Sequence, residues 1–507
     1  MTKDQVKPEP WNSRGINFHL TSRYPQVEAL IDSLLDEVIA HIKRRDNPKR
    51  IHTAKLKKSL SLVLLNLYSL HKVNRKKYVG YPRNPGGFQR TRYKRHNVGF
   101  DVFKNVVDTL DELGYLESHL GFHDKRIGIG RNSRIRANIS LIELFKEHKL
   151  APIMVEREKS EEVIILKSVN ILEDNSKEKF IVNYEDTKQT NLMRDNLHYI
   201  NALLDSRWID LEVSDKVYEK IAEETEKKKN RSDIDFNRKL LKRIFNNNSF
   251  EDGGRFYHGW WQEIPKEYRK FITIDGKRTV EVDYSSIHFR ILYAEQGIDI
   301  GDDDPYIIEG YEDRRSQIKI ALNIILNAET KDKAINAIAK KEKLNINKKT
   351  ALKIYDKLEE RHSPIKQYFG SGRGIKLQYK DSQIAEQVML NLAKSNIVCL
   401  PVHDSFIVRA SNQIELHEEM DKAFKDIVGI DTRRERNAIV IGSDVHKEES
   451  KRLYGDRGHK FYDEEGNLEG VIISGADINP DELFKIGKEY EGCRLREKEW
   501  VEHRGSI

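Results

Sequence analysis

The expected fold depends on the stretch Val280-Glu281-Val282-Asp283-Tyr284-Ser285-Ser286 and on its counterpart Leu400-Pro401-Val402-His403-Asp404-Ser405-Phe406. In each stretch, apolar residues typical of a strand lead to an aspartate, and the chain then turns. Two such strands lying side by side would hold the carboxylates of Asp283 and Asp404 close together. Two hard cations could then clamp an attacking hydroxyl and a triphosphate. Each aspartate taken alone could equally be a helix cap or a turn residue.

A helix expected between the two aspartates supplies positive charge. Residues 315–327 contain no glycine or proline and are rich in apolar side chains, which predicts a helix. Arg315 and Lys319 are four residues apart, so they project from nearly one face and could grip the phosphates of a nucleotide. Asn323 and Asn327 continue this polar stripe. The alternative is a solvated basic edge on an ordinary amphipathic helix.

Over residues 236–445 the sequence resembles the A-family nucleic-acid polymerases. Three segments are similar to their motifs A, B and C, respectively Asp283-Tyr284-Ser285-x-Ile287-x-Phe289-Arg290, Arg315-x3-Lys319 and Val402-His403-Asp404. Upstream, Gly254-Arg255-Phe256 and Gln262-Glu263-Ile264-Pro265 are similar to the segments that precede motif A. The resemblance implies a right-hand polymerase core of α+β class, with palm, fingers and a small thumb.

The resemblance also implies a role for each matching residue. Asp283 and Asp404 would hold two Mg²⁺ ions, with Mn²⁺ as the alternative metal, and the backbone carbonyl of Tyr284 would be a further ligand. Arg315 and Lys319 would bind the triphosphate, with Asn323 and Asn327 beside them. Contacts to the primer and template would come from His403, Arg255 and Gln262, and from one of Gln383 and Gln387. A glutamine in the minor groove can test base-pair geometry without reading the sequence.

The chain departs from DNA-specific members of the family at the positions that recognise the sugar. His288 stands where those polymerases have a glutamate, and Asn327 stands where they have a tyrosine. The segment Asp404-Ser405-Phe406 is more similar to the phage-type single-subunit RNA polymerases. These changes imply a relaxed or inverted sugar preference, so the expected substrates are NTPs, dNTPs or both.

The N-terminal part of the chain concentrates positive charge. Residues 41–100 carry 17 Lys or Arg residues and one acidic residue, Asp46, in a chain whose net charge is +7. The cations singled out as a nucleic-acid-binding region are Lys76, Lys77, Arg90, Arg92, Lys94 and Arg95, interleaved with Tyr78, Tyr81, Phe88 and Tyr93. This mixture favours neutralisation of a phosphate backbone with stacking on bases, and the alternative is a solvated linker.

A small folded unit is expected directly after this basic stretch. Apolar residues at helical spacing predict a helix over 101–113, with Asp101 as its N-cap and Gly114 at its end. Two extended pieces follow, so the region resembles a winged helix, or else is a small α+β spacer.

The whole chain divides into five expected regions. They are a tail and first helix (1–40), a basic nucleic-acid-binding domain (41–150), an α/β connector or thumb-like region (151–235), the polymerase palm and fingers (236–445) and a polar extension (446–507). No segment is apolar enough to cross a membrane. The absence of a signal-peptide pattern and the presence of only two cysteines favour the cytoplasm.

Two further features have ordinary structural explanations. Trp260 and Trp261 could stack on a base, but burial is at least as good an explanation. The run Asp302-Asp303-Asp304-Pro305 suggests a metal cluster, yet a cap before a helix that starts at Pro305 explains it better.

Three functions therefore remain open. The first is a template-directed primase-polymerase of a mobile genetic element, acting on single-stranded DNA template and primer–template duplex, with an accessory replication protein or a helicase as a candidate partner. The second is a conventional primer-dependent DNA polymerase without proofreading. The third is a DNA-binding replication initiator or regulator with an inactive palm. The changed sugar positions favour the first over the second, and the presence of both aspartates and both cations argues against the third.

Overall fold

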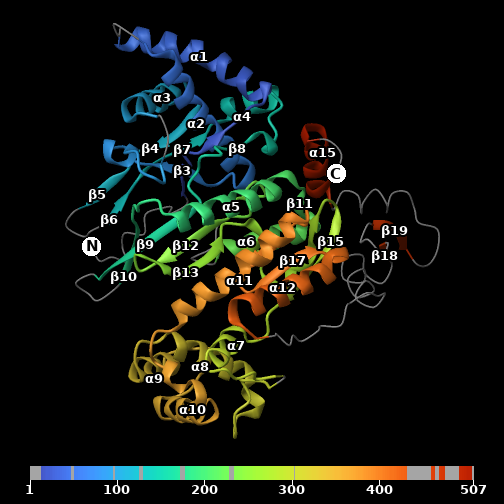
Figure 1. Cartoon of the computed structure of the whole chain (residues 1–507). Helices are drawn as coiled ribbons and strands as arrows, with labels where there is room; N and C mark the ends of the chain where they lie inside the picture. Colours follow the sequence, from blue (N-terminus) through green and yellow to red (C-terminus); the bar gives the residue numbers. More distant parts are fainter. Residues whose placement is uncertain are drawn as a thin grey trace. The chain divides into compact units, whose positions relative to one another are not determined.

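The computed structural model describes residues 13–46, 51–94, 98–124, 129–171, 177–227, 233–301, 303–430, 458–462, 468–473 and 490–504. The chain is a mixed α+β protein that divides into two compact units (Figure 1). The smaller unit comprises Met1–Glu162, Ala222–Asn237 and Arg494–Ser506, and the larger comprises Val163–Ile221 and Arg238–Cys493. Within the described ranges, no helix combines the length and the apolar character that crossing a bilayer requires.

The smaller unit is built on a four-stranded sheet in the order β1-β3-β7-β4. These strands are Ser13–Gly15, Tyr78–Tyr81, Ser133–Ala137 and Leu116–His119, and all neighbours are antiparallel except β1 and β3. The accompanying helices are α1 (Pro25–Asp46), α2 (Thr53–Val73), α3 (Phe100–Glu112) and α4 (Ile139–Glu147). Two strand pairs complete the unit, β2 (Leu20–Thr21) with β8 (Glu156–Arg157) and β5 (Phe122–Asp124) with β6 (Ile129–Arg131).

Helix α2 forms the centre of this unit. It is apolar around most of its circumference, and it packs against α1, α3 and strand β7. A helix with apolar residues on every side has to be buried, which explains its central place.

The helix expected at 101–113 is α3, which begins at Phe100. Asp101 is not its N-cap, because Gly99 occupies that position. The helix therefore has no side-chain cap. Asp101 instead lies in the first turn, where a negative charge favours the positive end of the helix dipole. Gly114 was expected to end the helix. It has φ +79°, the left-handed conformation that a glycine commonly adopts just after a helix.

The larger unit contains a five-stranded antiparallel sheet in the order β11-β14-β15-β17-β16. The strands are Ile209–Leu211, Ile272–Ile274, Lys277–Asp283, Ser405–Arg409 and Leu400–Val402. Helices α11 (Gly374–Lys394) and α12 (Gln413–Val428) pack against each other and against strands β16 and β17 (Figure 1). Both segments that the sequence predicted to be strands before an aspartate therefore belong to one sheet, with β15 at its centre and β16 at its edge.

A second sheet of the larger unit has the order β10-β9-β12-β13. Its strands are Lys177–Ile181, Ile164–Ile171, Lys242–Asn246 and Ser249–Tyr257. Helix α11 packs on β13, while α5 (Lys188–Ser206) packs on both β9 and α11. After α5 the chain continues through β11 into α6 (Asp215–Glu226).

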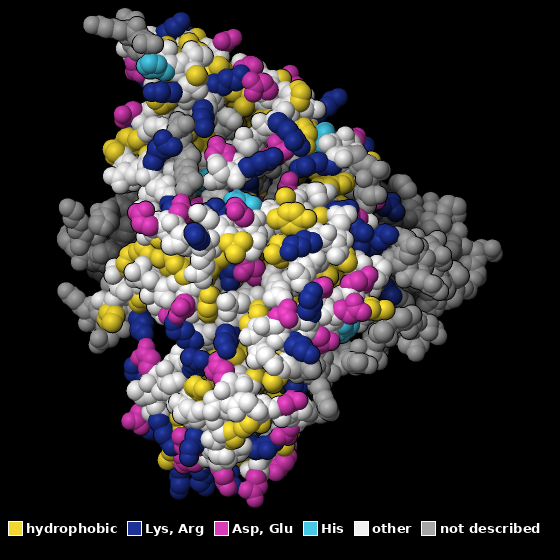
Figure 2. Space-filling view, viewed as in Figure 1, with side chains coloured by type: hydrophobic (Ala, Val, Ile, Leu, Met, Phe, Trp, Pro, Cys, Tyr) yellow, Lys and Arg dark blue, Asp and Glu magenta, His cyan; other side chains and the backbone are white. Residues whose placement is uncertain are grey.

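Helix α8 spans Arg315–Asn327, the same bounds that the sequence predicted. It packs with α9 (Lys331–Ala339) and α10 (Lys348–Arg361), and α7 (Ile287–Ala294) leads toward this group from the end of β15. On the face shown in Figure 2, positive and negative side chains are interspersed over α8, α9 and α10. Of the expected extension at 446–507, the described parts are the hairpin β18 (Gly458–Tyr462) and β19 (Leu468–Ile473), and α15 (Glu491–Arg504).

Burial of the two tryptophans is confirmed, since Trp260 and Trp261 are both 0% exposed. The indole of Trp261 donates a hydrogen bond to the Pro401 carbonyl (3.1 Å), which ties this segment to strand β16. The prediction of a helix that starts at Pro305 is wrong, because residues 305–306 form a turn. Asp304 instead accepts a hydrogen bond from the Tyr306 amide (2.9 Å), and Asp302 lies outside the described residues.

Candidate active site

The pairing of strands β15 and β17 brings the two predicted aspartates to one end of the sheet. In their antiparallel register Asp283 lies opposite Ser405, the residue directly after Asp404. The Tyr284 amide also donates a hydrogen bond to the Asp404 carbonyl oxygen (3.3 Å). Asp404 occupies the two-residue turn between β16 and β17, whose first residue, His403, has φ +62°. Asp404 is half-buried in this turn, just outside both strands.

The electrostatics of Asp283 reflect this proximity. Asp283 as a residue is exposed at the end of the sheet, yet desolvation of its carboxylate by the surrounding protein and the neighbouring negative charge of Asp404 raise the pKa of Asp283 to about 7. Lys266 and Lys319 oppose the shift through their positive charges. Two carboxylates that resist simultaneous ionisation form a site where a cation would relieve repulsion.

The raised pKa predicts a coupling between pH, divalent metal and stability. A carboxyl group with a higher pKa in the folded chain binds its proton more tightly there, so its contribution favours folding at low pH and fades as pH rises toward about 7. We expect Mg²⁺ to raise the melting temperature more at about pH 8 than at about pH 5.5, because the metal needs the ionised form. Thermal melts with Mg²⁺ and with EDTA measure this. Asp283→Asn should remove the pH-dependent part, and an equal Mg²⁺ effect at both pH values would contradict the assignment.

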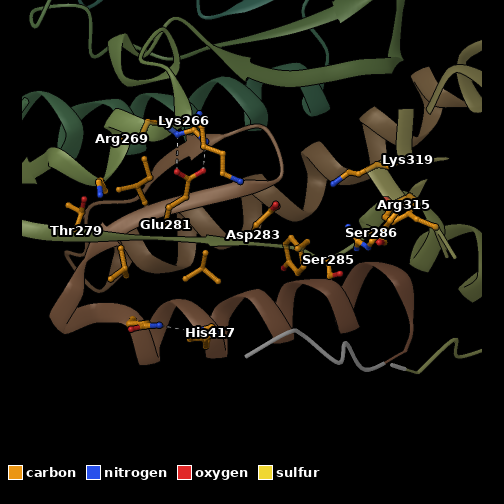
Figure 3. Close-up of a pocket in the computed structure, with 17 residues that line it drawn as sticks. Lys266, Arg269, Thr279, Glu281, Asp283, Ser285, Ser286, Arg315, Lys319 and His417 are labelled. Carbon is orange, nitrogen blue, oxygen red and sulfur yellow. Dashed lines mark hydrogen bonds and ion pairs between the residues drawn. The ribbon is translucent and has the colours of Figure 1, made fainter. Parts of the chain in front are cut away.

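A cavity of about 730 Å³ opens beside Asp283 (Figure 3). Its walls come from the 3-10 helix at Lys266–Phe271, strand β15, the start of α8 and helix α12. Five cationic side chains line it, namely Lys266, Arg269, Lys270, Arg315 and Lys319. Figure 3 shows Lys319 and Asp283 directed toward the same space, with Arg269 paired to Glu281 farther along the strand. Positive walls around a carboxylate suit a polyanion that brings its own metal ions.

The predicted pair Arg315 and Lys319 share one aromatic neighbour. The buried ring of Tyr306 lies 5.2 Å from the Arg315 guanidinium and 5.5 Å from the Lys319 ammonium. Arg315 also forms an ion pair with Asp304 (2.5 Å). Because both partners of that pair are partly exposed, separating them costs little, at most about 1 kcal/mol. Arg315 can therefore exchange Asp304 for a phosphate.

Asn323 and Asn327 are exposed on α8, one and two turns beyond Lys319. The Asn327 amide donates a hydrogen bond to the Asn323 carbonyl oxygen (2.7 Å). Its side chain also lies against Gly374 at the start of α11, where an added Cβ would come within 2.2 Å of the Asn327 amide oxygen. Gly374 thus lets α8 and α11 approach closely at this point.

Asp381 joins two of the predicted residues into one cluster that the motif comparison did not anticipate. Its carboxylate, with a side chain only 1% exposed, accepts hydrogen bonds from the Arg255 guanidinium at 3.0 and 3.1 Å and lies 2.8 Å from His288 Nε2. Burial lowers the pKa of Arg255, but its hydrogen bonds to Asp381 outweigh that effect and raise it overall. Arg255 on β13 and His288 on α7 are thereby fixed by one buried anion from α11.

Removal of the Asp381 charge is expected to destabilise the larger unit. Asp381→Asn keeps the shape of the side chain but leaves the guanidinium of Arg255 without its anionic partner. Breaking a buried ion pair in this way costs about 3 kcal/mol. Urea unfolding measures the difference, and Asp195→Asn, at an exposed position on α5, is the matched control with an expected change below about 0.5 kcal/mol. Equal stability of the two variants would show that Asp381 does not compensate Arg255.

The three predicted glutamines are held by contacts within the larger unit. Gln262 donates hydrogen bonds to the carbonyl oxygens of Phe256 (3.0 Å) and Pro401 (2.9 Å). Gln383 contacts the Tyr379 hydroxyl (3.3 Å), and Gln387 donates to Asp426 (2.6 Å). Gln262 therefore links strand β13 to strand β16, which ends directly before His403.

His403 lies close to the cluster formed by Asp381. Its ring packs edge to face with Tyr257, with 5.6 Å between the ring centroids. Burial, and then the positive charge of Arg255, lower the pKa of His403. His403 is therefore neutral near pH 7 and can accept as well as donate a hydrogen bond.

The basic N-terminal region requires a correction. Tyr78, Tyr81 and Phe88 were expected to stack on bases, but they are only 6%, 2% and 6% exposed and belong to the core of the smaller unit. Cations precede and follow strand β3, whose aromatic residues belong to the core, and the sequence pattern cannot distinguish such rings from a stacking surface.

The six predicted cations of this region have different surroundings. Lys76 and Arg90 are exposed. Lys77 pairs with Asp233 (2.7 Å), Arg92 pairs with Glu162 (2.9 Å), and Lys94 donates to the Gly87 carbonyl (3.1 Å). Arg95 lies outside the described residues.

The donor set fits a site for hard divalent cations in part. Asp283 and Asp404 offer carboxylate oxygens and Tyr284 a backbone carbonyl, the oxygen donors that Mg²⁺ prefers. Among the described residues, no group of three or more His, Cys, Asp or Glu side chains could hold a metal ion. The remaining coordination positions would be left to water and to the phosphates of a substrate, as is usual for Mg²⁺.

The second wall of the cavity lies outside the three motifs. The segment Lys266-Glu267-Tyr268-Arg269-Lys270 supplies three of its cations, and Glu281 lies two residues before Asp283 on the same face of β15. The basic run shortly before the predicted strand is the feature of the sequence that could have indicated this wall.

A scan against protein-family models gives no match for this chain, and a search of curated proteins also gives none.

Proposed function

We propose that this protein is a template-directed nucleotidyltransferase, a primase-polymerase of a mobile genetic element that works in the cytoplasm. The observation that carries the proposal is the register of β15 and β17. It puts Asp283 beside Asp404 at the edge of a cavity lined by Arg315 and Lys319. Paired carboxylates next to stacked cations are the arrangement that transfer of a nucleotidyl group needs.

Each group in the cavity has a defined task under this proposal. Asp283 and Asp404 would hold two Mg²⁺ ions, which when bound neutralise charge on the phosphates and favour the deprotonated 3′-hydroxyl. Lys319 and Arg315 would bind the β- and γ-phosphates from the side of α8. Tyr306 keeps these two cations on one side of the cavity, which limits the positions open to the triphosphate.

The cluster around Asp381 would orient the groups that contact the sugar and the primer end. Asp381 keeps the Nε2 side of His288 turned inward, so Nδ1 is the ring nitrogen left for a substrate hydroxyl. With Nε2 donating its proton to Asp381, Nδ1 of a neutral ring is an acceptor, which favours a ribose 2′-hydroxyl rather than excluding it. We therefore propose that NTPs are accepted at least as well as dNTPs. Single-stranded DNA would be the template, and exposed cations of the smaller unit, such as Lys76 and Arg90, would contact it.

Nucleotide incorporation on single-stranded DNA with Mg²⁺ tests the proposal. The reaction is run with and without an annealed primer, and with NTPs and dNTPs separately. Product formed without primer supports the primase-polymerase. Product formed only with primer identifies a conventional primer-dependent polymerase. Template binding without any product, also in the presence of a helicase or accessory replication protein, leaves the DNA-binding initiator or regulator.

A further inference from the structure

The cavity beside Asp283 has cations on two walls, of which α8 is the first. The second wall is the 3-10 helix η4 (Lys266–Phe271), which leads into β14. Figure 3 shows Lys266 and Lys319 on opposite sides of Asp283. The cavity measures about 730 Å³, more than twice the ~300 Å³ at which ligand sites begin, so it has room for two compact ligands.

The sequence of η4 turns cations toward the cavity. A 3-10 helix has about three residues per turn, so side chains three positions apart eclipse one another. Tyr268 and Phe271 form such a pair, and both are buried. Lys266 and Arg269 form another such pair, and both line the cavity. Burial of the two aromatic rings therefore fixes the side of η4 that carries the positive charge.

Arg269 anchors the second wall. Its guanidinium donates two hydrogen bonds to the Glu281 carboxylate, at 2.8 and 2.6 Å. The Ser405 hydroxyl donates to the same carboxylate (2.7 Å). Glu281 therefore holds η4 next to the start of β17, directly after Asp404, and Arg269 is occupied by this contact.

Lys266 and Lys270 are the cations of η4 that remain for a ligand. Both are exposed, and within the described residues neither forms an ion pair with a carboxylate. Glu267, between them in sequence, does not line the cavity. The acidic residues that do line it are Glu281, which is already paired, and Asp283.

Lys266 lies within electrostatic reach of the metal-binding aspartate. Desolvation and the charge of Asp404 raise the pKa of Asp283, and Lys266 is the first of the cations that oppose this rise. Once Asp283 holds a metal ion, as proposed above, its charge is no longer available to Lys266. A phosphate bound by Lys266 would therefore lie near the metal site.

Transfer of a nucleotidyl group joins two phosphorylated partners. The attacking 3′-hydroxyl oxygen bonds to the α-phosphorus of the triphosphate, the bond from that phosphorus to the bridging oxygen breaks, and pyrophosphate leaves, while the hydroxyl proton passes to solvent. Helix α8 has cations for the triphosphate, so the attacking nucleotide needs cations on the opposite side of Asp283. A primase has to hold that nucleotide without a primer duplex.

We infer that Lys266 and Lys270 form a second phosphate subsite, which binds the phosphates of the nucleotide whose 3′-hydroxyl attacks. This inference rests on the nucleotidyltransferase function proposed above and deepens it. The ligand is the 5′-triphosphate of an initiating nucleotide in synthesis without a primer, or the last phosphodiester of a primer. The competing arrangement is one triphosphate that lies across both walls.

The dependence of initiation on the phosphates of the first nucleotide tests the inference. A single-stranded DNA template that directs adenosine and then guanosine is used, with saturating GTP and with ATP or adenosine as the initiating compound. The unsubstituted chain should favour ATP at least about tenfold in kcat/KM, because ionic contacts to its phosphates are absent with adenosine. Lys266→Ala combined with Lys270→Ala should remove this preference, whereas a merely structural defect would slow both initiators equally.

Two comparisons make the test specific. Lys394→Ala combined with Lys422→Ala removes two exposed lysines, on α11 and α12, that do not line the cavity, so the preference for ATP should remain. Lys319→Ala should slow both initiators and keep the preference, because its phosphate partner is on the incoming nucleotide. Circular dichroism checks that every variant is folded.

A primed reaction distinguishes the two sources of phosphate. An annealed primer whose last linkage is a neutral methylphosphonate is compared with the natural primer. If the double variant at Lys266 and Lys270 abolishes a preference for the natural linkage, the primer phosphodiester occupies the subsite. A preference confined to initiation with ATP identifies the initiating nucleotide. Either result supports the subsite, and unchanged preferences in the double variant overturn it.

Nucleotide binding decides the inference if the chain synthesises nothing, which would refute the proposed function separately. Isothermal titration calorimetry with ATP and Mg²⁺, without template, should then give two sites per chain. Lys319→Ala should remove one site and the double variant at Lys266 and Lys270 the other. A single site that either variant removes would mean one triphosphate across both walls, and that result, or the absence of a second site, overturns the inference.

Discussion

Asp404→Asn is expected to reduce nucleotide incorporation by a factor on the order of 10³ or more. The substitution keeps the shape of the side chain but removes one of the two carboxylates that would hold the metal ions. Stabilisation of transition-state charge by metal ions amounts to several kcal/mol, and about 4 kcal/mol corresponds to three powers of ten in rate. Single-turnover extension of a primed template measures the loss.

The fold and template binding should survive this substitution. The contact that Asp404 makes with Tyr284 uses the backbone carbonyl oxygen, which asparagine retains. Anisotropy of a labelled single strand should therefore show affinity within about twofold of the unsubstituted chain. Asp195→Asn on α5 serves as the control for charge alone and should leave incorporation unchanged. Loss of binding as large as the loss of synthesis would remove Asp404 from the catalytic site.

Lys319→Ala is expected to lower kcat/KM for the nucleoside triphosphate on the order of 10²-fold. A hydrogen bond to a charged group contributes about 1.5–3 kcal/mol, and the upper part of that range corresponds to two powers of ten. Lys319 is exposed in the middle of α8, where alanine favours the helix, so stability should not fall. Steady-state kinetics with varied triphosphate concentration measures the effect.

Two comparisons make this expectation specific. Lys353→Ala removes an equally exposed lysine on α10, away from the cavity, and should leave kcat/KM unchanged. Lys319→Arg keeps the positive charge and should recover part of the activity. Equal kinetics for Lys319→Ala and Lys353→Ala would mean that α8 presents an ordinary basic edge to solvent, which was the alternative interpretation of its sequence.

Local elements near the candidate site were predictable because their signals are local. The apolar run before Asp283 and the one before Asp404 predicted strands, and β15 and the β16–β17 hairpin are present. The helix at 315–327 was predicted with its bounds, since an uninterrupted apolar pattern without glycine or proline favours one conformation. The cap of α3 was predicted wrongly, because the choice between Gly99 and Asp101 depends on where the preceding chain enters the helix.

The sequence by itself determined the order of these elements and the residue types that they present: two aspartates after strands, and two cations one helical turn apart. Only the tertiary structure decided which side chains meet. Asp381 contacts Arg255 and His288 across sequence separations of 126 and 93 residues, and Tyr78, Tyr81 and Phe88 are core residues rather than stacking surfaces. The physical reason is that such contacts depend on how helices are rotated and packed against sheets. Short-range periodicity does not encode that rotation.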